Sequence, residues 1–157
     1  MIMVSPAHLQ ETHSKRVRAI LLTGNNEVLF IKRIKPHKPQ PYWVAPGGGV
    51  EAEDEDIFAA LHRELYEELG AEAQVIAPAF LLQHEKAGKQ LEEHFFVCQL
   101  LNYDLSQRHG PEFDDPSRGH YIPDAVLLTP KAIKALNILT PELQTWLLKH
   151  LAYLRSL

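Results

Sequence analysis

The chain has a single cysteine, Cys98, among its 157 residues. One thiol can form neither an internal disulfide framework nor a cysteine-based zinc site. Cys98 ends the apolar run 94–98, where no cationic neighbour is present to lower its pKa. We therefore expect a buried thiol that takes no part in chemistry.

Long apolar runs and an excess of positive charge are also missing. No stretch approaches the roughly 20 apolar residues that span a bilayer, and residues 1–16 lack a basic segment followed by an apolar one. We expect a soluble, cytoplasmic protein that does not enter a membrane. The net charge of −4 argues against nucleic-acid binding driven by bulk charge. A small phosphate-bearing substrate remains compatible, because metal ions can bridge two sets of negative charges.

The composition is that of an ordinary folded chain. There are 8 glycines and 11 prolines, too few for a fibrous or low-complexity protein, and 45% of the residues are hydrophobic. The length fits one domain, which we predict to span residues 1–157.

Six segments have the pattern of β-strands. We predict strands over residues 16–22, 28–33, 42–45, 72–82, 94–101 and 121–128, with the first two forming a hairpin. The unbroken apolar run 19–22 indicates a strand covered on both faces. The three glycines at 47–49 are expected to form a turn of high backbone freedom. A polar connection is expected at 84–90 and a long surface loop at 102–119.

The clearest helix is predicted over residues 56–69. Ile57, Leu61, Leu65 and Leu69 recur at every fourth position, Asp54 or Asp56 can cap the first turn, and Gly70 follows the last. Two more helices are predicted to begin at the Thr-Pro pairs 129–130 and 140–141. The apolar side chains expected to be buried by the last helix are Leu143, Trp146, Leu147, Leu151 and Leu154.

Glu64, Glu67 and Glu68 lie three and four positions apart on the 56–69 helix, so their carboxylates project side by side. Such a cluster is most often a solvated helix face. Its repulsion can also be relieved by a divalent cation such as Mg²⁺, which prefers carboxylate oxygens. The exposed backbone of the preceding glycines could approach the same metal or a phosphate.

The segment from Gly49 to Ala71 resembles the Nudix box of the Nudix hydrolase family. Gly49 is followed by Glu55, then by Arg63-Glu64-Leu65-x-Glu67-Glu68-x-Gly70-Ala71, and every fixed position of the box matches. Ala71 stands where the family usually has a larger aliphatic residue, so we expect slightly looser packing there. The resemblance implies an α/β (α+β) fold, namely an α/β/α sandwich with a central mixed β-sheet flanked by helices.

The resemblance also implies an activity and a set of roles. The expected reaction is the Mg²⁺- or Mn²⁺-dependent hydrolysis of a diphosphate linkage in a nucleoside diphosphate joined to another group. Glu64, Glu67 and Glu68 would bind the metal together with the carbonyl of Gly48. Glu55 and Arg63 would form a pair that holds the glycines against the helix, for which a bidentate Arg–carboxylate contact is well suited.

The general base and the substrate contacts are less sharply marked. In the family the base is a box glutamate or a carboxylate outside the box, for which Glu112 is our candidate and Glu92 and Glu93 are weaker ones. Arg33 and Lys35 lie in or beside a basic patch near the glycines, where they could meet substrate phosphates or simply be solvated. Tyr42 is a further candidate for substrate binding.

Several alternatives stay open at this point. A Nudix fold could act as a non-catalytic module that binds a nucleotide or nucleotide sugar, although such modules usually lose box carboxylates. Diphosphate isomerisation would call for a catalytic cysteine, and Cys98 is poorly placed for it. The expected partner is a nucleotide-type diphosphate rather than a nucleic acid, and a homodimer is possible. An oxidised nucleoside triphosphate, ADP-ribose, a dinucleoside polyphosphate and a nucleotide sugar all remain candidate substrates.

Overall fold

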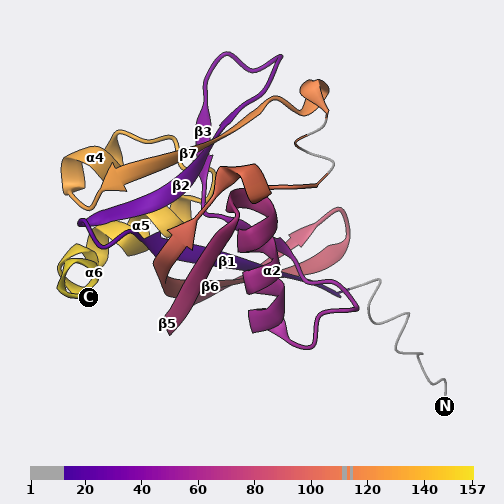
Figure 1. Ribbon diagram of the computed structural model, residues 1–157, viewed down its shortest axis with the longest axis horizontal. Helices are drawn as coiled ribbons and strands as arrows, with labels where there is room; N and C mark the ends of the chain where they lie inside the picture. The colour runs from indigo at the N-terminus through magenta and orange to yellow at the C-terminus, as the bar shows by residue number, and fades with distance from the viewer. Residues whose placement is uncertain (1–12, 111–112, 114) are drawn as a thin grey trace.

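The computed structural model of the chain describes residues 13–110, 113 and 115–157. A mixed sheet of seven strands lies between helices on its two faces, in the predicted α/β/α arrangement (Figure 1). The strands are β1 (His13–Leu22), β2 (Glu27–Ile34), β3 (Tyr42–Val44), β4 (Gly47–Gly49), β5 (Ala71–Lys86), β6 (Lys89–Tyr103) and β7 (His120–Leu127). The helices are α2 (Ile57–Leu69), α4 (Pro130–Lys134), α5 (Pro141–Lys149) and α6 (Leu151–Ser156).

Strand β1 is the centre of the sheet. It pairs antiparallel with β2 and β4 and parallel with β6. Ile20 and Leu22 pack into the core beneath α4, α5 and α6, whereas Ala19 and Leu21 pack into the core beneath α2. The prediction that the run 19–22 is covered on both faces is therefore confirmed.

The three glycines form a strand rather than the free turn that we expected. Gly47 to Gly49 pair with Arg16 to Arg18 as strand β4. A Cβ atom on Gly47 would collide with the backbone carbonyl of Val17. Glycine is thus needed here for close approach of two backbones, and the pairing holds the segment in place instead of leaving it mobile.

Strands β5 and β6 form a hairpin that is longer than predicted. Pairing continues through Glu85–Gln90 and Lys86–Lys89, and the turn is confined to Ala87 and Gly88, both with positive φ. The expected polar connection at 84–90 is wrong, because its exposed polar residues belong largely to the two paired strands. Exposed polar side chains are compatible with a solvated ladder as well as with a loop, and composition alone does not separate the two.

Helix α2 begins and ends as predicted. The Asp56 carboxylate accepts a hydrogen bond from the Ala59 N–H at 2.8 Å, and Gly70 closes the helix in the left-handed conformation at φ 59°. At the C-terminal end of the chain, the single predicted helix is instead two, α5 and α6, which meet at His150. Four of its five predicted buried residues are buried, and Trp146 is half-buried.

Cys98 lies fully buried on β6, as expected, and burial raises the pKa of its thiol to about 12. Across residues 13–110, 113 and 115–157, no helix has the length and apolar character needed to span a membrane.

The two glycines Gly70 and Gly88 offer a matched test of backbone packing. Both have positive φ, but a Cβ on Gly70 would collide with the backbone carbonyl of Asp104, whereas a Cβ on Gly88 meets no atom within 4 Å. Gly88→Ala should cost about 1 kcal/mol of unfolding free energy, from backbone strain alone. Gly70→Ala should cost at least about 1 kcal/mol more, because the clash adds to the strain. Urea denaturation measures both, and equal losses would contradict this packing.

Candidate active site

The site is formed where strand β4 faces helix α2. The Gly47 N–H donates a hydrogen bond to Oε1 of Glu68 at 3.2 Å. The carboxylate of Glu64 lies against Gly48, since a Cβ there would be 2.6 Å from each of its oxygens. A side chain at Gly48 would therefore displace Glu64, and the bare backbone is what allows the strand and the carboxylates to meet.

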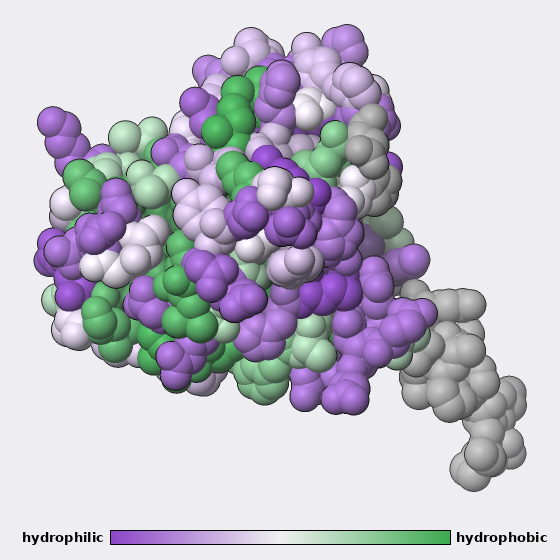
Figure 2. Space-filling view, viewed as in Figure 1, coloured by the Kyte–Doolittle hydropathy of each residue, from purple (hydrophilic) through white to green (hydrophobic). Residues whose placement is uncertain are grey.

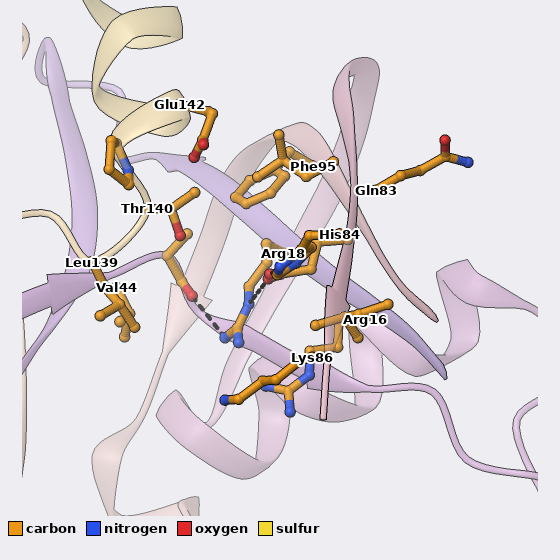
Figure 3. Close-up of a pocket in the computed structure, with 15 residues that line it drawn as sticks. Arg16, Arg18, Val44, Gln83, His84, Lys86, Phe95, Leu139, Thr140 and Glu142 are labelled. Carbon is orange, nitrogen blue, oxygen red and sulfur yellow. Dashed lines mark hydrogen bonds and ion pairs between the residues drawn. The ribbon is translucent and has the colours of Figure 1, made fainter. Parts of the chain in front are cut away.

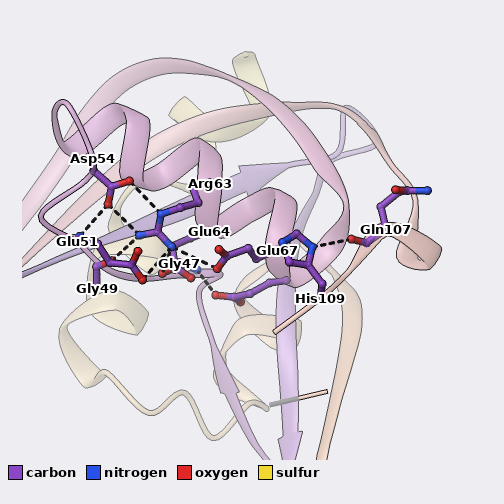
Figure 4. A network of polar contacts seen from close by, with 10 residues as sticks. Gly47, Gly49, Glu51, Asp54, Arg63, Glu64, Glu67, Gln107 and His109 are labelled. Carbon is purple, nitrogen blue, oxygen red and sulfur yellow. Dashed lines mark hydrogen bonds and ion pairs between the residues drawn. The ribbon is translucent and has the colours of Figure 1, made fainter. Parts of the chain in front are cut away.

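Arg63 joins the elements of this site through one guanidinium (Figure 4). Its Nε and Nη2 bind both carboxylate oxygens of Asp54 at 3.0 and 2.9 Å, and Nη2 also donates to the Gly49 carbonyl at 2.9 Å. Its Nη1 lies 3.1 Å from Oε1 of Glu64 and 3.3 Å from Oε2 of Glu67. The guanidinium thus connects the loop before α2 with β4, which we call the glycine strand, and with the glutamates of α2.

The predicted pair of Arg63 with Glu55 is wrong, because Asp54 takes that place. The Asp54 carboxylate also accepts a hydrogen bond from the Glu51 N–H at 2.8 Å, which closes the turn and directs the carboxylate toward Arg63. The Asp54 side chain is only 7% exposed, whereas Glu55 is exposed to solvent. The sequence pattern marks Glu55 as fixed, but it does not show which of two adjacent acids faces the helix.

Charge and burial shift the pKa values of these groups in opposite directions. The hydrogen bonds from Arg63 lower the pKa of Asp54, and the same contacts raise the pKa of the Arg63 guanidinium. Burial raises the pKa of Glu64, and the neighbouring charge of Glu67 raises it further, while Arg63 acts against both. Arg63 therefore offsets part of the repulsion within the glutamate cluster.

The donor set suits a hard divalent cation. Glu64 and Glu67 share one nitrogen of Arg63, so both carboxylates lie within reach of a single positive centre beside the glycine strand. Carboxylate and carbonyl oxygens are the ligands that Mg²⁺ and Mn²⁺ prefer. In the present side-chain arrangement, no three Asp, Glu, His or Cys side chains of the described residues converge as a metal cage. The ligand roles of Glu64, Glu67, Glu68 and the Gly48 carbonyl therefore stay predictions.

A cavity of about 320 Å³ adjoins Glu64 and Glu68. Of the predicted substrate contacts, Arg33 and Tyr42 line it, together with Arg118 and Tyr121, which the sequence did not single out. Arg33 is buried and fixed: its guanidinium stacks 3.4 Å over the Tyr121 ring and donates to the carbonyls of His120 and Arg118. Lys35 is exposed, with its Nζ 5.7 Å over the Tyr42 ring.

The three candidates for a general base outside the box differ in their surroundings. Glu112 lies outside the described residues. Glu92 is paired with His94 at 3.2 Å. Glu93 is buried and accepts hydrogen bonds from Arg18 at 3.2 Å, with His84 at 3.1 Å from its other oxygen. Arg18 was not predicted, although a charged residue between Val17 and the apolar run 19–22 was a signal that could have identified it.

Substituting the two adjacent acids separately tests the Arg63 network. Asp54→Ala should lower the unfolding free energy by about 2 kcal/mol near neutral pH, because it removes a two-point contact and a turn hydrogen bond. Glu55→Ala should change it by less than about 0.5 kcal/mol. Since folding lowers the Asp54 pKa, its contribution is present above the ordinary value of 3.8 and is lost as the pH falls through the lowered value. Denaturation at neutral and acid pH measures this difference, and a larger loss in the Glu55 variant would restore the original prediction.

Comparison with known proteins gives a consistent result. Residues 12–141 match the family model of the NUDIX domain. Nudix hydrolase 5 of Arabidopsis thaliana is 29% identical over 91 residues, which are 57% of this chain but only 30% of that protein. The chain thus spans less than a third of the length of this relative.

Solved structures share the fold over most of the chain. A NUDIX hydrolase from Nitrosomonas europaea superposes with a TM-score of 0.68 at 18% identity, covering 90% of both chains. A UDP-X diphosphatase superposes with a TM-score of 0.64 at 19% identity, covering 94% of this chain and 66% of the other. The family match, the complete box and the shared sandwich agree: the chain belongs to the Nudix hydrolase family.

Proposed function

We propose that this protein is a metal-dependent pyrophosphohydrolase that cleaves a diphosphate linkage in a nucleoside diphosphate joined to another group. The observation that carries the proposal is that the Glu64 and Glu67 carboxylates both bind Nη1 of Arg63, and that the Glu64 carboxylate lies directly against the backbone of Gly48. That arrangement suits the binding of a cation between acidic side chains and linked phosphates.

Each group at the site has a definite task under this proposal. Glu64, Glu67, Glu68 and the Gly48 carbonyl would hold Mg²⁺ or Mn²⁺. When bound, the metal would activate a water and neutralise charge on the phosphate oxygens. Arg63 keeps Glu64 and Glu67 at a fixed distance from the glycine strand.

The neighbouring cavity supplies the remaining groups. Arg33 and Tyr42 would contact the substrate from its wall. The general base is proposed to be a box glutamate or Glu112. Glu93 is disfavoured as the base, because Arg18 and His84 already occupy its oxygens.

The two alternative functions are less well supported. A non-catalytic binding module would not need the complete set of box carboxylates that this chain keeps. Isomerisation through a cysteine conflicts with the position of Cys98, whose thiol is fully buried. The likeness to a UDP-X diphosphatase keeps nucleoside diphosphates with a second attached group among the candidate substrates. A cytoplasmic location and a homodimer stay predictions.

Substitution of the box glutamates tests the proposal. Glu67→Gln and Glu68→Gln should each lower kcat by about a hundredfold or more while the fold survives, because a neutral amide binds a divalent cation poorly. Excess EDTA should abolish hydrolysis across a panel of nucleoside diphosphate derivatives with products identified by mass.

Glu53→Gln is the matched control, because Glu53 is an exposed acid in the loop before the same helix. It should retain the activity of the parent protein. Full activity of either box variant, or full activity in EDTA, would refute the metal-dependent reaction. Binding of panel compounds without any product would favour the non-catalytic module.

A further inference from the structure

A second cavity, of about 480 Å³, adjoins the candidate active site (Figure 3). It lies between β1, the β5–β6 hairpin and the start of α5. Arg18, Val44 and Leu139 line both this cavity and the one beside Glu64. A substrate bound at the glutamates could therefore extend past Arg18 into this second space, which we call the side cavity.

One wall of the side cavity holds a preformed polar network. Glu93 is only 8% exposed, and its carboxylate binds Nε of Arg18 on one oxygen and Nε2 of His84 on the other. Nη1 of Arg18 donates to the Ala45 carbonyl at 3.2 Å. Two contacts thus fix the Arg18 guanidinium at the junction of the cavities.

The same wall carries more positive charge than the structure neutralises. Arg16, Arg18 and Lys86 all line the side cavity, and Figure 3 shows them on one side of it, away from Glu142. Arg18 is paired with Glu93, but neither Arg16 nor Lys86 has an ion pair with any residue that the structure describes. Cationic side chains gathered around a concave surface attract an anionic ligand, because the low-dielectric walls concentrate their field.

The rest of the side cavity is largely apolar. Val44, Leu82, Leu91, Phe95 and Leu139 line it, and the ring of Phe95 is stacked on Phe80 at a centroid distance of 4.3 Å. Its volume lies within the range of about 300–1,000 Å³ that is common for small-molecule sites. The space therefore suits an organic group that carries a negative charge, rather than a free inorganic ion.

We propose that the side cavity binds one of the two groups joined by the diphosphate, and that this group carries a further anionic substituent held by Arg16, Arg18 and Lys86. The inference rests on the proposed function, because the diphosphate itself is placed at the box glutamates. The substituent is a phosphate monoester or a carboxylate, which share the oxygens that guanidinium and ammonium groups bind.

Pairs of diphosphates that differ in a single anionic group test the inference. NADP⁺ with NAD⁺ and coenzyme A with dephospho-coenzyme A report on a phosphate, and UDP-glucuronate with UDP-glucose reports on a carboxylate. Hydrolysis is measured with Mg²⁺ or Mn²⁺. Each compound is also tested as a competitive inhibitor of the hydrolysis of a second diphosphate that the protein cleaves. The inhibition constant then reports the binding of a compound that is not itself cleaved.

The decisive variants are Lys86→Gln and the double variant Arg16→Gln/Lys86→Gln, with Lys89→Gln as the control. Lys89 faces Lys86 across the same hairpin but does not line the cavity. We expect the parent protein to prefer the charged member of at least one pair by about tenfold, in kcat/KM or in inhibition. The double variant should lose most of this preference through KM or Ki, Lys86→Gln should lose part of it, and Lys89→Gln should retain it.

The outcomes separate this inference from the proposed function. The inference is overturned if kcat/KM and inhibition are the same for both members of all three pairs, or if the preference is unchanged in the double variant. Hydrolysis would in either case continue to support the proposed function. Absence of hydrolysis of every diphosphate by the parent protein overturns the proposed function. A double variant that weakens charged and uncharged members equally, while its circular dichroism matches the parent, also overturns the inference.

Discussion

The site depends on one guanidinium. Three carboxylates within two turns of α2 repel one another, and the glycine strand that faces them has no side chains with which to anchor itself. Arg63 reduces the repulsion because it binds Glu64 and Glu67. It also anchors the glycine strand, because the same guanidinium binds the Gly49 carbonyl and Asp54. A lysine could not replace it, since a single ammonium cannot make the two-point contact and reach the remaining partners in fixed directions.

Strand β1 has an equally central place in the fold. Its apolar half separates the two cores, and its charged half, at Arg16 and Arg18, lines the cavities. The same strand pairs with the glycines of β4 and with β6, which contributes Glu93. The position of Arg18 relative to Glu93 is consequently set by backbone pairing in the sheet rather than by flexible loops.

The sequence predicts features that repeat or that rest on local rules. The limits of α2 follow from the apolar residues at every fourth position and from its caps, and the burial of β1 on both faces follows from its apolar run. It does not predict long-range pairing. Strand β4 consists of residues that normally weaken strands, so it depends on its pairing with Arg16 to Arg18, which lie far earlier in the chain. The exposed ends of β5 and β6 pair with each other across a tight turn, but they have the composition of a loop, which composition alone does not distinguish from a solvated hairpin.

In the candidate site, too, the sequence predicts the residues that follow a local pattern but not those that long-range contacts bring together. The box pattern identifies the glutamates and Arg63, whereas Asp54 takes the role expected of Glu55 because a turn hydrogen bond directs it. Arg18 and Glu93 form their pair across 75 positions of sequence, and only the register of β1 with β6 brings them together.

The absence of side chains on β4 has an evolutionary consequence. A Cβ atom on Gly47 would collide with the backbone of Val17 and one on Gly48 would displace Glu64, so two of the three positions of the strand closest to the glutamates tolerate substitution poorly. Heritable change in this part of the molecule is thereby directed to the surrounding strands and loops. A lineage carrying this site can diversify in the compounds that it recognises while the reacting centre stays the same.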